Sequence, residues 1–358
     1  MSQYQAPLND ILFNLFDVWQ LDKYWQQQSQ LSELIEADTA KAILEEAAKI
    51  CEQQIAPFSG EADQRGAQLQ DGKVSLPEHY YTAYQSLSEG GWTGLSGAAE
   101  YGGMGMPKAL SMMVDEMLCS ADIAFSLYPG LTAGACVALL QHADEASKAL
   151  YLPKMYSGEW SGTMCLTEAH AGSDLGIMRT TAKPADDGSY LLSGSKIFIT
   201  AGEHDLTSNI IHLVLAKLPD APAGVKGISL LLVELDRPGV TRTALAKMGW
   251  HASDTATIHF DNVEVPAENL IGPENGGFAG IMRNFNGERL GMSQQANAFA
   301  RICYEDALDW ARQRETFGKP LITNQVIRHK LADMVRRITA TQAWIDHCAW
   351  TVEIGCAF

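Results

Sequence analysis

The spacing of hydrophobic residues changes twice along the chain, and each change marks a predicted domain boundary. In residues 1–160, apolar positions recur with the 3.6-residue period of amphipathic helices. In residues 161–272 the period falls to two, which is typical of strands, and in residues 273–358 the helical period returns. The pattern predicts an α+β protein with a helical N-terminal domain, a central small β-barrel-like domain and a C-terminal helical bundle.

Prolines mark the ends of several predicted helices in the N-terminal domain. A helix in "TAKAILEEAAKICEQQIAP" is expected to stop at Pro57, and the next helix starts on Pro77. Pro107 opens "PKALSMMVDEMLCSAD", where its missing N–H costs nothing. A further helix is expected at about 144–157. No strand is expected before residue 160.

The central segment contains three strand patterns. Ile258 and Phe260 alternate with polar neighbours in "ATIHFDNVEVP". The stretch "DDGSYLLSGSKIFIT" predicts a hairpin with Gly188 in one turn and Gly194 in the next. The continuous apolar run "GISLLLVEL" predicts a strand that is covered on both faces.

Two long helices are predicted after Pro273. One face of the first carries four apolar residues and one face of the second carries five. These residues are Phe278, Ile281, Met282 and Phe285, and then Ile327, Leu331, Met334, Val335 and Ile338. The sequence ends at Phe358 within a helical pattern and without a capping residue, so the predicted bundle is incomplete.

Composition narrows the classes of function. The net charge of −17 leaves no basic stripe to neutralise phosphates, which argues against nucleic-acid binding. Seven cysteines without metal-ligand spacing fit reduced thiols, a cytoplasmic location and no metal site. The N-terminus lacks the basic region of a secretory signal, and no apolar run is expected to span a membrane. No G-x-G-x-x-G links a strand to a helix, so a nicotinamide cofactor is not predicted.

One strand end has the chemistry of a heterocycle-binding loop. In "TMCLTEAHAGSDLG", Thr167 and Ser173 supply hydroxyls, and the small residues between them allow close approach of backbone N–H groups. In "GSKIFITAGEH", Phe198 can lie on an aromatic face and Thr200 can bond to a ring nitrogen. Each half alone could be an ordinary hairpin loop, but the pair in a β domain between helical domains is more specific.

The motifs together resemble those of the acyl-CoA dehydrogenases, a family of flavoproteins that oxidise acyl-CoA thioesters to trans-2-enoyl-CoA. The resemblance covers nearly the whole chain and is carried by "LTE" with "AGSD", by "FIT", and by "RETFGK". The first 160 residues resemble a long bacterial branch that includes methylthiopropionyl-CoA dehydrogenase-like enzymes. In the family, further helices follow the position of Phe358.

The resemblance implies FAD as cofactor and assigns roles to individual residues. Arg314, Thr316 and Gln325 correspond to residues that hold the pyrophosphate and adenine end from a neighbouring subunit. The expected FAD-binding residues are Met164, Cys165, Leu166, Thr167, Gly172, Ser173, Phe198, Ile199, Thr200, Arg314, Thr316, Phe317 and Gln325. The expected substrate-binding residues are Ser173, Tyr128, Leu131, Phe285, Asn286 and Arg289. Ala169 and His170 replace a common Pro-Gly pair. His170 is expected to be solvated, with a place near the flavin as the alternative.

Tyr128 and Leu131 are expected at the closed end of the acyl pocket, which suggests a short or medium chain. They lie in "FSLYPGLTAG", which matches the family helix that floors the pocket. Pro129 and Gly130 are expected to interrupt this helix.

Glu288 in "NFNGERLGMS" is the expected catalytic base. It follows Phe285 by three residues, near the buried side of the helix, where burial would make a carboxylate a usable base. Two branches of the resembled family place their base in an E-R pair at this position, whereas most members place it near the C-terminus. The base is therefore Glu288 or lies in a segment beyond Phe358.

Three functions remain open from the sequence. The first is an acyl-CoA dehydrogenase of fatty acid β-oxidation, a homo-oligomer (dimer or tetramer) that passes electrons to an electron-transfer flavoprotein. The second is an acyl-CoA oxidase, in which oxygen takes the electrons. The third is a non-catalytic chain that binds acyl-CoA or a protein partner. The flavin spectrum of the purified protein separates the third from the others.

Overall fold

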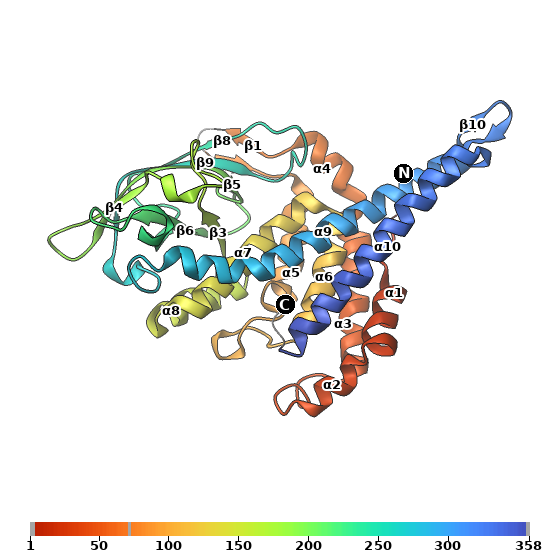
Figure 1. The fold of residues 1–358 in the computed structure, drawn as a ribbon, viewed down its shortest axis with the longest axis horizontal. Helices are drawn as coiled ribbons and strands as arrows, with labels where there is room; N and C mark the ends of the chain where they lie inside the picture. The colour runs from red at the N-terminus through yellow and green to blue at the C-terminus, as the bar shows by residue number, and fades with distance from the viewer. Residues whose placement is uncertain (1–3, 71–72, 356–358) are drawn as a thin grey trace. The chain divides into compact units, whose positions relative to one another are not determined.

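The computed structural model describes residues 4–70 and 73–355, so Phe358 lies outside the described residues. Figure 1 draws the chain as a ribbon. The contacts within the chain divide it into two compact units. The first contains the described residues of Met1–Ser59, Met106–Ile123 and Arg289–Phe358. The second contains those of Gly60–Gly105 and Ala124–Glu288.

The first unit is helical and packs around α6. Helix α6 contacts both α3 and α10, and a short hairpin of β10 and β11 joins α9 to α10. The elements are α1 (Leu8–Leu12), α2 (Leu21–Gln27), α3 (Ala37–Ile50), α6 (Lys108–Ala121), α9 (Gly277–Gln313, from Arg289 onward in this unit), β10 (Glu315–Thr316), β11 (Lys319–Pro320) and α10 (Gln325–Glu353).

The helix expected to stop at Pro57 leaves regular α geometry earlier, at Ile50. The chain continues through a π-helical segment, Cys51–Ile55, and a 3-10 turn, Ala56–Phe58, that contains the proline. Proline donates no backbone hydrogen bond, so the helical ladder changes its spacing before and around it.

The N-terminal helices of this unit are held against the end of α10. Trp25 is fully buried, and its indole Nε1 donates to Glu353 Oε1 at 2.9 Å. The other carboxylate oxygen of Glu353 accepts the N–H of Ala109, an otherwise unpaired donor in the first turn of α6. Trp19 stacks on Trp350 with ring centroids 5.5 Å apart. One carboxylate therefore links three helices of this unit.

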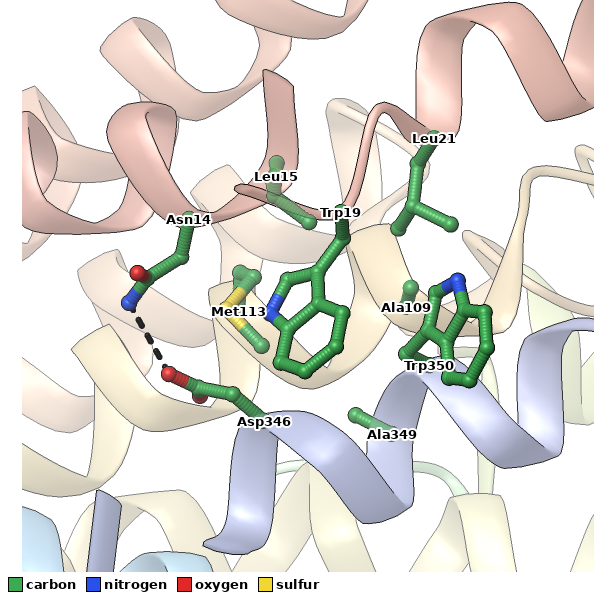
Figure 2. Close-up of a pocket in the computed structure, with 9 residues that line it drawn as sticks. All are labelled: Asn14, Leu15, Trp19, Leu21, Ala109, Met113, Asp346, Ala349 and Trp350. Atoms are coloured by element: carbon green, nitrogen blue, oxygen red, sulfur yellow. Dashed lines mark hydrogen bonds between the residues drawn. The ribbon is translucent and has the colours of Figure 1, made fainter. Parts of the chain in front are cut away.

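Beside this contact, Asn14 donates to Asp346 of α10 at 2.9 Å (Figure 2). Leu15, Trp19 and Leu21 close over a cavity of about 10 Å³, which has room for about one water molecule. The N-terminal segment thus packs on α6 and α10 with almost no space between them.

The second unit combines helices with the large sheet. Asp144 caps α8, and its side chain accepts the N–H of Ser147 at 2.7 Å. A two-stranded hairpin of β1 and β2 lies in the segment that was expected to be purely helical. Its apolar positions, Leu69 and Val74, pair directly across the two strands. The helices and the hairpin are α4 (Ser59–Arg65), β1 (Gln68–Gln70), β2 (Lys73–Ser75), α5 (Glu78–Glu89), α7 (Ile123–His142) and α8 (Glu145–Tyr156).

The large sheet has seven strands in mixed orientation. Strand β6 pairs in parallel with β3 and β4 and antiparallel with β7. Strand β5 pairs antiparallel with β4 and β9, and β9 pairs antiparallel with β8. The path runs β3-β6-β4-β5-β9-β8, with β7 paired to β6. The strands are β3 (Trp160–Cys165), β4 (Thr181–Pro184), β5 (Tyr190–Thr200), β6 (Asn209–Lys217), β7 (Ile228–Glu234), β8 (Val240–Ala244) and β9 (Thr255–Val265).

Strands β6 and β7 are buried on both faces, which confirms the prediction made for β7 from the run "GISLLLVEL". Leu213 and Leu215 join a core with residues of α7, α8 and α9, whereas Val214 and Ala216 join a core with β5 and β9. Ile281 and its neighbours on α9 belong to the first core, which confirms the predicted apolar face of that helix.

Two local predictions were wrong. Gly194 does not turn the chain: β5 is one continuous strand, and Gly194 lies at a register shift against β9. A side chain there would collide with Thr180, so glycine permits a close crossing rather than a turn.

Pro129 and Gly130 do not interrupt α7. Buried residues on either side of them, such as Phe125 and Thr132, pack in the core and keep the helix continuous.

No apolar run was expected to be long enough to span a membrane, but helix α7 reaches that length. Among the described residues it alone is long and apolar enough to cross a membrane by these two criteria. Half of that window is buried inside the structure, as in a core helix, so the observation is weak evidence for a span.

The Trp25–Glu353 contact predicts a stability difference between two tryptophans. Trp25→Phe should lower the free energy of unfolding by roughly 2 kcal/mol, because it leaves a void and removes the hydrogen bond to a carboxylate. Trp344→Phe, at a position 67% exposed on α10, should change it by less than about 0.5 kcal/mol. Urea unfolding followed by circular dichroism tests both, and equal losses would contradict the assignment.

Candidate functional site

The two polar segments singled out from the sequence adjoin in the second unit. The N–H of Ile197 donates to the carbonyl of Thr167 at 2.9 Å. The hydroxyl of Thr163, within β3, donates to the carbonyl of Thr200 at 2.6 Å. The sheet therefore brings together two loops that lie about thirty residues apart in the sequence.

A β-bulge turns Phe198 out of the sheet. Lys196 pairs with Ile258 and Ile199 with Ala256, so two residues of β5 stand opposite one residue of β9. Phe198 has a left-handed backbone, with φ 61°, and remains 65% exposed. A large residue in this conformation is strained, and such strain is concentrated at functional sites.

The other residues of the two segments divide by the direction of their side chains. Cys165 and Ile199 are buried in the sheet core, so only their backbones can face a ligand. Met164 and Leu166 are partly buried against the other core, while Gly172 and Ser173 are exposed. Thr167 and Thr200 are half-buried, and within the described chain no hydrogen bond uses either hydroxyl.

A buried ion pair joins Lys196 to Glu168, and the sequence reasoning missed it. Lys196 Nζ is 3.0 Å from Glu168 Oε1, and Lys196 has no exposed surface. Burial would raise the pKa of Glu168, but the Lys196 ammonium and the N–H groups of residues 179 and 180 outweigh it and hold the pKa at about 2. Both residues lie within the "LTE" and "GSK" motifs. Nothing in their spacing predicted the pair.

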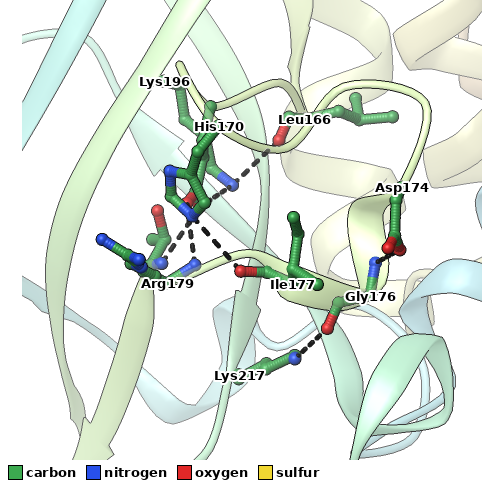
Figure 3. Close-up of polar contacts among 10 residues, drawn as sticks. Leu166, His170, Asp174, Gly176, Ile177, Arg179, Lys196 and Lys217 are labelled. Carbon is green, nitrogen blue, oxygen red and sulfur yellow. Dashed lines mark hydrogen bonds and ion pairs between the residues drawn. The ribbon is translucent and has the colours of Figure 1, made fainter.

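His170 is exposed, as expected, but its ring also contacts the loop. Its Nε2 lies 3.2 Å from the carbonyl of Ile177 and 3.5 Å from Glu168 Oε2 (Figure 3). The ring is part of the contacts that hold this loop, although about a third of its side chain remains exposed.

Glu288 lies in the part of α9 that belongs to the second unit, and it is half-buried. Its Oε1 accepts a hydrogen bond from Asn284, one turn earlier, at 2.9 Å. The same amide group donates to the carbonyl of Gly134 in α7 at 3.2 Å. A methyl group at Gly134 would come within 2.9 Å of Glu288 Oε1, so glycine there makes room for the carboxylate. Asn284 was not singled out from the sequence.

Tyr128 is almost fully buried, and its hydroxyl is engaged. It donates to the carbonyl of Ala252 at 2.9 Å and accepts the N–H of Asp254 at 2.8 Å. Its ring meets His204 edge-on. Burial lowers the pKa of His204 to about 3, so that imidazole is neutral. Leu131 is half-buried on the same helix, and its placement in an acyl pocket, like that of Tyr128, stays a prediction.

The remaining predicted residues are mostly exposed. In the first unit, Arg314 and Gln325 flank the β10–β11 hairpin, whose Phe317 has φ 53° and a fully exposed side chain. Figure 1 shows this hairpin at the tip of the α9 and α10 pair. Thr316 is half-buried in β10, and Arg289 is exposed on α9. In the second unit, Asn286 is exposed and Phe285 packs partly against the core.

A larger cavity of about 510 Å³ lies in the second unit. One side is lined by α4 and the β1–β2 hairpin, and the other side by the segment that joins β8 to β9. None of the sequence-predicted site residues lines it. Its two cations are already engaged, since Arg65 donates to the carbonyl of Leu76 and Lys247 donates to that of Ser253 at 2.5 Å.

Models of three acyl-CoA dehydrogenase domains match consecutive parts of the chain. The N-terminal domain matches residues 37–159, the middle domain residues 163–263 and the C-terminal domain residues 275–357. The chain therefore belongs to the acyl-CoA dehydrogenase family.

Individual relatives agree with this assignment. The chain is 42% identical to 3-methylmercaptopropionyl-CoA dehydrogenase of Ruegeria pomeroyi over 96% of its own length, but it spans only 62% of that relative. It is 35% identical to acyl-CoA dehydrogenase of Bacillus subtilis, over 76% of this chain and 71% of the relative. The structure of butyryl-CoA dehydrogenase from Megasphaera elsdenii aligns with a TM-score of 0.79 at 33% identity, over 89% of this chain and 80% of that one. These comparisons confirm the predicted helical, β and helical order.

The ion pair at Glu168 predicts how stability depends on pH. The folded-state pKa of Glu168 is depressed to about 2, so its contribution is present above the unfolded value of about 4.3 and is lost as the pH falls towards 2. In Glu168→Gln, the loss of unfolding free energy between about pH 5 and pH 3 should be smaller than in the parent. Glu264→Gln, on the exposed part of β9, should keep the parental dependence. Urea unfolding at each pH measures the difference, and parallel curves for all three proteins would contradict it.

Proposed function

We propose that this chain is the flavin-binding part of an acyl-CoA dehydrogenase that oxidises an acyl-CoA thioester to trans-2-enoyl-CoA. The observation that carries the proposal is the junction of residues 164–173 with residues 198–200, where two hydroxyls and an exposed aromatic ring lie on adjoining segments. Such a junction suits the edge and face of a flat heterocycle.

The residues at this junction fit FAD. Thr167 and Thr200 offer hydroxyls for the ring edge, Phe198 offers an aromatic face, and the exposed Gly172 and Ser173 allow close backbone approach. Met164, Cys165, Leu166 and Ile199 would contribute backbone groups or apolar contact beside the ring. When bound, FAD would supply the redox chemistry, as the acceptor for a hydride from the substrate.

The exposed hairpin of the first unit would hold the other end of FAD. We assign Arg314, Thr316, Phe317 and Gln325 to the pyrophosphate and adenine end of a cofactor bound to a second copy of this chain. A guanidinium fork suits pyrophosphate oxygens. An exposed aromatic side chain on a left-handed turn suits contact with another surface.

Glu288 is proposed as the base that removes the α-proton of the thioester. The Asn284 amide fixes one carboxylate oxygen, and the small Gly134 leaves space beside it. A base held in this way can meet a substrate proton with little reorganisation. Phe285, Asn286 and Arg289 on the same stretch of α9, with Ser173, Tyr128 and Leu131, are proposed to contact the acyl-CoA.

The wider assignments are also proposals. We infer that residues 1–160, 161–272 and 273–358 form the three functional domains. We also infer that an electron-transfer flavoprotein accepts the electrons. The protein would act in the cytoplasm as a dimer or tetramer in fatty acid β-oxidation. Oxygen as acceptor would make it an acyl-CoA oxidase instead. The reaction of the reduced flavin with oxygen distinguishes these two activities.

The proposed FAD contacts predict a loss of cofactor. Thr200→Val removes a hydroxyl at the ring edge, and Arg314→Ala removes a cation at the pyrophosphate, so each should weaken FAD binding about tenfold or more. Equilibrium titration of the flavin-free chain, followed by flavin fluorescence, measures the dissociation constant. Thr351→Val, whose hydroxyl bonds within α10, is a matched control that should bind FAD as the parent does. Parental affinity in both test variants would exclude this site.

Glu288→Gln tests the base separately from binding. The amide keeps the shape but takes up no proton, so the variant should bind FAD and acyl-CoA yet lose on the order of 10²–10⁴ in the rate of flavin bleaching. Stopped-flow absorbance with a panel of acyl-CoAs measures this rate. Glu305→Gln, further along α9, is the control and should bleach at the parental rate. Parental bleaching in Glu288→Gln would place the base elsewhere.

A further inference from the structure

The ammonium group of Lys196 holds the backbone on both sides of Thr167. It donates to the carbonyl of Leu166 at 3.0 Å and to the carboxylate of Glu168 at 3.0 Å (Figure 3). The N–H of Ile197, the next residue of β5, donates to the carbonyl of Thr167 itself. Three consecutive residues after β3 are therefore tied to two consecutive residues of β5.

The carboxylate of Glu168 extends this link to the far end of the loop. Its Oε2 accepts the N–H of Arg179 at 2.7 Å, and its Oε1 accepts the N–H of Thr180 at 3.0 Å. Residue 180 directly precedes β4, so one side chain closes the loop that carries Gly172 and Ser173. The loop from 166 to 180 thus has both ends fixed to a single buried group.

Burying two charges is costly unless each is paired and its remaining hydrogen-bonding capacity is met. Here the carboxylate accepts one ammonium and two amide protons, and the ammonium also meets a carbonyl. An apolar pair could fill the same volume, but it could not bond to the three backbone groups of Leu166, Arg179 and Thr180 at once. The pair therefore specifies a backbone geometry that hydrophobic packing alone would leave open.

The geometry that it specifies includes the strained bulge. Lys196 immediately precedes the two bulged residues, and Phe198 holds a left-handed φ of 61°. Such a conformation persists only where its neighbours determine it. Lys196 and Ile197 are anchored on one side of Phe198, and the carbonyl of Thr200 is anchored on the other.

We propose that Lys196 and Glu168 are positioning residues of the flavin site, and that they set Thr167 and Phe198 in their binding geometry before the cofactor arrives. This inference rests on the proposed function. Neither residue needs to touch the flavin. Their effect on affinity comes from order already present in the flavin-free chain, because a preformed site loses less conformational freedom on binding.

The test removes both charges together, because a single substitution leaves a buried charge without its partner. In Lys196→Met/Glu168→Gln, the dissociation constant for FAD should rise about tenfold or more, and the visible absorption band of the bound flavin should shift. The matched control is Glu234→Gln, which alters a carboxylate of the same sheet that bonds to Asn209 and Tyr151. It should bind FAD with the parental constant and band.

Thermal unfolding of each variant separates positioning from general stabilisation. Parental FAD affinity and an unshifted band in the double variant would overturn the inference, whatever the change in melting temperature. If the parent chain itself binds no FAD, the proposed function fails and this inference fails with it. Failure of the double variant alone to lose affinity leaves the proposed function intact.

Hydrogen exchange on the parent chain decides the question if the double variant does not fold. In the flavin-free parent, the amides of Arg179, Thr180 and Ile197 should exchange as slowly as paired amides within β5, because the loop is already ordered. Exchange at the rate of an exposed loop would show that the ion pair does not preorganise the site, and would overturn the inference.

Discussion

Burial of β6 and β7 on both faces is the constraint on which the rest of the second unit depends. Their side chains point alternately into two cores, so one face must be covered by helices and the other by strands. Polar loops cannot lie on either face without leaving backbone groups unpaired. The segments with binding chemistry are therefore confined to the ends of β3 and β5, where backbone groups can be bonded locally or offered to a ligand.

At those ends the structure combines strain with strong polar anchoring. Phe198 is exposed in an unfavourable backbone conformation, and the buried Lys196–Glu168 pair lies beside it. The order supplied by the pair can offset the strain in the bulge, since each hydrogen bond of the pair fixes a backbone position near it. The same principle appears in the first unit, where the Glu353 carboxylate bonds to Trp25 and Ala109 and connects helices from distant parts of the sequence.

Helix α9 shows how a small local choice can prepare a site. Asn284 lies one turn before Glu288 and bonds both to its carboxylate and to the backbone of α7. Gly134 leaves the space that the carboxylate occupies. The orientation of this carboxylate thus depends on residues whose importance lies in their size and hydrogen-bonding groups rather than in any reactivity of their own.

Periodicity in the sequence was enough to place the helical and β segments, the doubly buried strand and the apolar face of α9, because these follow from which residues must leave water. The sequence motifs were enough to identify the family. Predictions from single residues failed where packing outweighed local propensity. Gly194 allows β5 to pass close to Thr180 and makes no turn, and Pro129 lies inside an unbroken helix. The hairpin of β1 and β2 was missed because each strand is too short to show a period. Only the tertiary structure decided that Lys196 meets Glu168 and that Asn284 holds Glu288, since each contact depends on how strands and side chains approach in space, which sequence separation does not encode.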